Sequence, residues 1–198
     1  MIPNIDEITK ELSALQKRQD RVMDLSRSII RLTGYAITAI HNRDFKSSSA
    51  SMKELQALMK ELSVAEKGFE YYSQQAHQEF TELMVFMSVI KDGKIPSMKE
   101  IGETAVPYLL GIMDVVGELK REAYEALRKG DAAEAESYYE KMQGIYDATR
   151  HIRFAESLMP GFRKKQDVAR ILIEGTGSDL LGVAQSKHRH SSPGKRNK

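Results

Sequence analysis

The chain has 198 residues, of which 41% are hydrophobic and 29% charged, a balance typical of a folded protein and not of a disordered one. It has no cysteine, which excludes disulfides and thiolate metal sites. The formal net charge of +2 is unevenly distributed, because the last twelve residues, KHRHSSPGKRNK, hold five Lys and Arg and no acid. The rest of the chain is therefore net negative, and any affinity for a polyanion must come from local basic patches.

The first forty residues predict one long helix. The chain from Ile5 to about Asn42 has no proline, and its apolar residues recur at helical intervals. At 1.5 Å per residue such a helix is roughly 55 Å long, which exceeds the width of a small globular core. We expect it to pack along another long helix or a second subunit. The apolar positions are Ile5, Ile8, Leu12, Leu15, Val22, Leu25, Ile29, Ile30 and Ile37.

Turn and capping signals divide the rest of the chain into further helices. The serine-rich stretch 46–51 is interpreted as a loop that leads into a capping box, Ser51 with Glu54. Ser97 and Asp131 are further capping residues, each with a glutamate three positions later. The helices expected after the first cover about 52–67, 69–90, a short segment after 97, 107–129, 131–159 and 163–185.

We therefore predict an all-α fold of seven helices over 1–186, followed by a basic, disordered tail at 187–198. The chain starts with polar residues, so no secretory signal is visible. Its longest apolar stretch, 105–117, contains Asp114 and is too short to cross a bilayer. A cytoplasmic location without membrane contact is the expectation.

Two acidic pairs lie in otherwise apolar helices. Glu79 and Glu82 are three residues apart, and Asp114 and Glu118 are four apart, so each pair shares one helix face. Asp114 is the more unusual, because a lone buried carboxylate costs several kcal/mol unless it is paired, protonated or bound to a cation. If the pairs face each other, four carboxylates form an all-oxygen site that suits Mg²⁺ or Mn²⁺. Such a site can support phosphodiester hydrolysis.

Other interpretations of these acids stay open. Glu79 and Glu82 can be ordinary solvated residues, and Asp114 can form a structural ion pair, for example with an arginine of the first helix. A metal-binding regulator without catalysis also fits the spacing. A di-iron carboxylate bundle does not, because it needs Glu-x-x-His pairs and none of the five histidines has an acid three residues before it.

The first helix is also basic. Two interpretations of its cations are open: a face neutralised by the interleaved acids Asp20 and Asp24, or a row of charges that follows a phosphate backbone. A second basic cluster, 162–170, begins a helix, where cations oppose the helix macrodipole. Such charge usually serves a partner or another helix's C-terminus. The candidate arginines of the first helix are Arg18, Arg21, Arg27 and Arg31.

The motifs around the acids resemble a known family. Gln78-Glu-Phe-Thr-Glu82 and Pro107-Tyr-Leu-Leu-Gly-Ile-Met-Asp-Val-Val-Gly-Glu-Leu119, followed by Gly130-Asp131, are similar to the translin family. The closer likeness is to its catalytic branch, translin-associated factor X, in a prokaryotic, archaeal form. It spans about residues 5–180.

This resemblance implies a seven-helix fold that assembles into a hollow octamer and cleaves single-stranded RNA inside it with Mg²⁺. Glu79, Glu82, Asp114 and Glu118 match the family's catalytic, metal-binding acids, and the basic first helix resembles its RNA-contacting helix. The leading hypothesis is a Mg²⁺-dependent endoribonuclease in a homo-octamer. The alternatives are an oligomer that binds single-stranded RNA or DNA without cleaving it, and a structural oligomer whose acids serve only packing.

Overall fold

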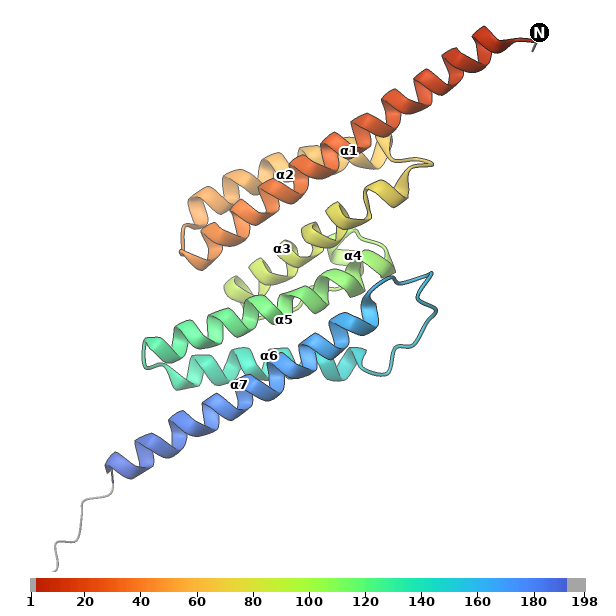
Figure 1. Ribbon diagram of the computed structural model, residues 1–198. Helices are drawn as coiled ribbons and strands as arrows, with labels where there is room; N and C mark the ends of the chain where they lie inside the picture. Colours follow the sequence, from red (N-terminus) through yellow and green to blue (C-terminus); the bar gives the residue numbers. More distant parts are fainter. Residues whose placement is uncertain (1–2, 192–198) are drawn as a thin grey trace, which may run out of the picture. The chain divides into compact units, whose positions relative to one another are not determined.

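In the computed structural model residues 3–191 are described, with side chains for 3–185. These residues form seven α-helices and one 3₁₀ helix, with no strand among them (Figure 1). The all-α class, the seven helices and the long first helix are thereby confirmed. The elements are α1 (Ile5–His41), α2 (Phe45–Ala65), η1 (Glu70–Tyr72), α3 (Gln74–Asp92), α4 (Met98–Ile101), α5 (Ala105–Arg128), α6 (Ala132–Thr149) and α7 (Phe162–Ser191).

The chain divides into two compact units, and the boundary lies inside α5, between Gly111 and Ile112. The first unit holds α1 to α4 and the start of α5, and the second holds the rest of α5 with α6 and α7. The division into one domain, 1–186, and a tail stays a prediction. Helix α7 runs into the expected tail as far as Ser191, and residues 192–198 lie outside the described part of the chain.

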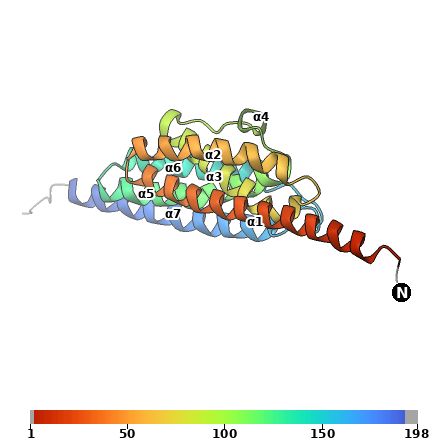
Figure 2. The ribbon, with the colours of Figure 1, turned by 90° about the horizontal axis from the view of Figure 1, so that it is seen from above.

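In the first unit α1 lies beside α2 and also packs on α3 (Figures 1 and 2). The later turns of α1 are buried through Val22, Leu25 and Ile29, which recur at helical spacing. Both views show the first turns of α1 extending beyond the end of α2. The apolar residues of those turns are exposed: Ile5, Ile8, Leu12 and Leu15.

The start of α2 corrects the sequence analysis. The stretch 46–51 is helical, and the cap is Asp44, whose carboxylate accepts a hydrogen bond of 3.0 Å from the Ser47 N–H. Serine is a modest helix former, but Ser48 and Met52 are buried in the packed unit. The Asp44 cap and tertiary packing therefore start the helix about two turns before the expected Ser51 cap.

The start of α3 also differs from expectation. A single helix was predicted from Phe69, whereas the chain forms η1 first and begins α3 at Gln74. The Glu70 carboxylate accepts a hydrogen bond of 3.0 Å from the Gly68 N–H, and the Ser73 hydroxyl donates to the Glu70 carbonyl at 3.0 Å. These local bonds favour a tight turn over a continuous α-helix.

Two predicted caps are present. Ser97 and Glu100 form a reciprocal capping box at α4, and the Asp131 carboxylate accepts from the Glu134 N–H at 2.9 Å at the start of α6. Both motifs act within four residues, so they could be recognised without the tertiary structure.

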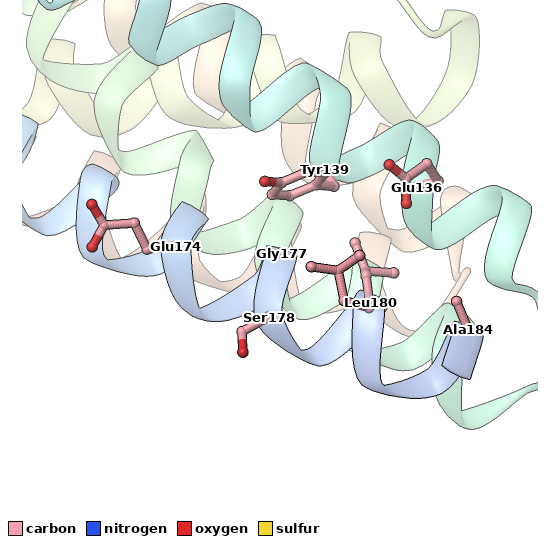
Figure 3. Close-up of a pocket in the computed structure, with 8 residues that line it drawn as sticks. Glu136, Tyr139, Glu174, Gly177, Ser178, Leu180 and Ala184 are labelled. Atoms are coloured by element: carbon pink, nitrogen blue, oxygen red, sulfur yellow. The ribbon is translucent and has the colours of Figure 1, made fainter. Parts of the chain in front are cut away.

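In the second unit α7 continues past its predicted end at Gln185 and is not interrupted at Gly177. A Cβ on Gly177 would lie 2.5 Å from the Tyr139 hydroxyl of α6, so the missing side chain makes room for the Tyr139 ring against α7 (Figure 3). Packing therefore compensates for the low helix propensity of glycine here. No helix in the described residues is both long and apolar enough to span a membrane.

Candidate functional site

Glu79 and Glu82 lie on α3 in the first unit. The Glu82 side chain is only 8% exposed, among the buried residues Thr81 and Leu83, whereas Glu79 is half-buried. Both residues take part in interactions within the protein. A buried carboxylate is costly, so Glu82 is not the ordinary solvated residue that one interpretation of the sequence allowed.

Helix α5 packs against α3 next to these acids. A Cβ at Gly111 would lie 2.5 Å from the Gln78 carbonyl oxygen and 2.7 Å from the Thr81 Cβ. Real side-chain carbons do not approach so closely, so glycine is needed for this contact. Gly111 lies within the motif 107–119, and a glycine inside an apolar helix is the sequence signal for such close packing.

Asp114 and Glu118 lie on α5 in the second unit, and both are half-buried. Asp114 forms an ion pair with Lys165 of α7, and the two side chains are 25% and 26% exposed. The structural interpretation gave an arginine of the first helix as an example of a partner, and the structure identifies Lys165 as one partner of Asp114. The pairing spans 51 residues of sequence, which no spacing rule could predict.

The prediction that the two acidic pairs face each other stays a prediction. Within the described residues no three His, Asp or Glu side chains are arranged to hold a metal ion. The donor chemistry nevertheless fits a hard cation, since each pair offers two carboxylates from one helix face. The Asp114 carboxylate is already paired with the positive charge of Lys165.

Two of the candidate arginines of α1 stabilise their own unit. Arg18 donates to the Lys67 carbonyl oxygen at 2.9 Å, and its guanidinium lies 5.2 Å from the centre of the Phe69 ring. Arg21 pairs with Glu61 of α2. These contacts connect α1 to the end of α2, a structural role that the sequence analysis had not assigned to them.

The other two candidate arginines are more available to an external anion. Among the described side chains Arg27 pairs only with Asp24 of its own helix, at 2.6 Å, and both side chains are more than 60% exposed. Arg31 is exposed and has no hydrogen bond or ion pair to any residue whose side chain is described. Of the four candidates, Arg31 therefore has the charge best placed to meet an external anion.

His77, which sequence reasoning did not select, links three segments of the first unit. Its Nδ1 lies 2.8 Å from the Glu103 carboxylate and its Nε2 lies 2.9 Å from that of Glu66. Burial alone would lower the pKa of His77, but the hydrogen bonds and charges of Glu103 and Glu66 outweigh it and raise the pKa to about 9. The imidazolium thus holds the end of α2 and the segment before α5 against α3.

Replacing His77 by Gln is expected to destabilise the protein by about 2–3 kcal/mol at pH 6. Because the folded-state pKa is raised, the wild-type contribution is complete below about pH 6.5 and is lost as the pH rises through about 9. Urea unfolding at pH 6 and at pH 9.5 measures the free energy of unfolding of variant and wild type. The difference between variant and wild type should shrink at the higher pH, while the exposed control His151→Gln should change little at either.

Comparison with known proteins identifies the chain's relatives. The sequence model of the translin family matches residues 4–174. The chain belongs to the translin family. A curated relative, an uncharacterized protein of Methanocaldococcus jannaschii, is 29% identical over 193 residues, covering 94% of this chain and 86% of the relative.

Solved structures give the same relationship. The crystal structure of apo-NeC3PO has a TM-score of 0.83 and 26% identity, covering 91% of this chain and 97% of that one. The structure of AfC3PO in complex with duplex RNA has a TM-score of 0.85 and 27% identity, covering 96% of this chain and all of that one. The translin resemblance expected from the motifs on α3 and α5 is therefore confirmed.

Proposed function

We propose that this translin family member is a Mg²⁺-dependent endoribonuclease that cleaves single-stranded RNA. In this proposal Glu79, Glu82, Asp114 and Glu118 bind the metal, and copies of the chain assemble into a hollow homo-octamer around the RNA. Mn²⁺ can replace Mg²⁺ in an all-carboxylate site. The proposal extends the RNA complex of AfC3PO, a structural relative, to this chain.

The observation that carries the proposal is the helix face on which the acids lie. Asp114 and Glu118 follow Gly111 by three and seven residues, so all three lie on one face of α5. That face meets α3 at Gln78, and Glu82 lies one helical turn after Gln78. The close contact at Gly111 is thus made by the acid-bearing face of α5, which supports a shared site.

The bound metal would lower the pKa of a water molecule and stabilise charge on the phosphodiester. The chain's own groups have separate tasks. The carboxylates hold the cation and one of them takes up the proton of the attacking water. The α1 arginines hold the RNA backbone, and Arg31, whose charge has no partner among the described side chains, is best suited to this role.

The decisive test is cleavage of a circular single-stranded RNA, because a circle has no end for an exonuclease. We expect cutting with Mg²⁺ or Mn²⁺ and none with EDTA, and weaker cutting of a perfect duplex. Electrophoresis measures the products. If the circle stays intact with Mg²⁺ and with Mn²⁺, the proposed endonuclease activity is refuted.

The non-catalytic alternative makes a different prediction. A protein that only binds single-stranded RNA or DNA should show salt-dependent binding that EDTA leaves unchanged, with no cutting. Measuring filter binding beside cleavage on one RNA separates the two functions. Size-exclusion chromatography with light scattering tests the expected octamer.

A further inference from the structure

A pocket rich in arginine lies in the second unit, where the end of α6 and the chain that follows it meet the first turns of α7. Its volume is about 340 Å³. Three guanidinium groups line it against a single carboxylate, so its charge is positive. The lining residues are Tyr146, Arg150, Arg153, Arg163, Gln166 and Asp167.

The pocket is built around a buried amide. Gln166 is 5% exposed, and its Nε2 donates to the Thr149 carbonyl at the end of α6 at 2.7 Å. Its Oε1 accepts from Arg153 at 2.9 Å, and Arg153 also donates to the Ile152 carbonyl at 2.8 Å. These bonds hold the Arg153 guanidinium in a defined position although its side chain reaches solvent.

Arg150 and Arg163, the other two arginines of the pocket, have positive charge available for an anion. Arg150 contacts Asp147 at 3.4 Å, and both side chains are more than half exposed, so this pair is weak. Arg163 has no hydrogen bond or ion pair among the described side chains. It lies in the first turn of α7, where a cation opposes the helix macrodipole, so helix stability does not explain it. A bound anion would interact favourably with both.

We propose that this pocket binds a phosphate group of the RNA chain. A guanidinium group can donate two parallel hydrogen bonds to two phosphate oxygens. Several guanidinium groups that converge on one pocket therefore favour a single compact anion. A phosphomonoester at a chain end carries more charge than an internal diester, and it matches the arginine excess better. The inference rests on the proposed function in taking RNA as the source of the phosphate.

The pocket is also close to a candidate catalytic acid. Lys165, which pairs with Asp114, precedes the pocket residue Gln166 directly on α7. One turn of α7 therefore contacts Asp114 and lines the pocket. A phosphate held there would anchor the RNA within the same unit as that acid.

Binding in EDTA tests the pocket without cleavage. Fluorescence anisotropy would compare a single-stranded RNA with a 5′-phosphate, the same RNA with a 5′-hydroxyl, and inorganic phosphate as competitor. We expect Arg163→Gln and Arg153→Gln each to weaken binding of the phosphorylated RNA about tenfold and to lower the salt slope by about one. Arg170→Gln, on α7 but outside the pocket, is the matched control. Arg163→Gln breaks no hydrogen bond or ion pair to any side chain that the structure describes, so it is informative even if Arg153→Gln folds poorly.

The outcomes distinguish the sources of phosphate. A loss confined to the 5′-phosphorylated RNA supports a terminal-phosphate site, and an equal loss for both RNAs supports an internal phosphodiester. Pocket variants that bind both RNAs like the wild type would overturn the inference, as would a wild type that binds no RNA. If the circle is not cut but the variants lose affinity, the nuclease proposal fails and the phosphate site stands.

Discussion

Replacing Glu82 by Gln or Asp114 by Asn is expected to lower Mg²⁺-dependent RNA cleavage on the order of 100-fold or more. Each change keeps the side-chain volume but removes a negative charge from the proposed metal site. Single-turnover cleavage across a range of Mg²⁺ concentrations measures the loss. The control is Glu140→Gln, an exposed acid on α6, which should cleave like the wild type.

The Asp114 variant also separates catalysis from packing. Without its carboxylate partner the half-buried Lys165 loses an ion pair, so unfolding should become easier by about 1 kcal/mol. If Asp114 serves only contacts within the protein, the variant loses stability with no change in Mg²⁺ affinity. If it also binds metal, Lys165→Met should raise Mg²⁺ affinity, because a competing cation is removed. Isothermal titration with Mg²⁺ gives these affinities directly.

The largest expected effect on stability is that of Gly111→Ala. Its methyl group would lie 2.5 Å from the Gln78 carbonyl oxygen, a backbone atom of α3 that cannot rotate away. The helices must separate, which should cost about 2–3 kcal/mol and lower the melting temperature by about 5–10 °C. Urea unfolding measures the loss of stability, and thermal melting measures the fall in melting temperature.

The same helix provides the matched control for that prediction. A Cβ at Gly117 meets no other atom within 4 Å, so Gly117→Ala should gain up to about 1 kcal/mol from helix propensity. An alanine at 111 that left stability unchanged would mean that α5 and α3 do not require the close contact. The expected signs of the two substitutions are therefore opposite.

The features predicted correctly from sequence are those encoded over a few residues. The Ser97 and Asp131 caps, the continuous first helix and the family motifs on α3 and α5 are all local patterns. The helical face shared by Asp114 and Glu118 follows from their spacing alone. These signals were sufficient for the fold class and for choosing the candidate acids.

What sequence reasoning missed depends on distant neighbours. Lys165 meets Asp114 across 51 residues, and His77 meets Glu103 across 26, and neither pairing leaves a local pattern. The start of α2 was wrong for a related reason: serine has a modest helix propensity, but the Asp44 cap and the burial of Met52 in the packed unit outweigh it. The arginine pocket likewise depends on a buried glutamine whose two partners lie outside its own helix.

The unbroken course of α5 has a consequence for how the sequence can vary in length. Each residue of an α-helix advances the chain by about 100° around the axis. One residue inserted between Gly111 and Asp114 would leave Gly111 in its contact with α3 but turn Asp114 and Glu118 by about 100° around the α5 axis relative to Gly111. An insertion in the loop before α5 would have no such effect. The length of the segment from Gly111 to Glu118 therefore fixes the angle around the α5 axis between the close contact and the two acids.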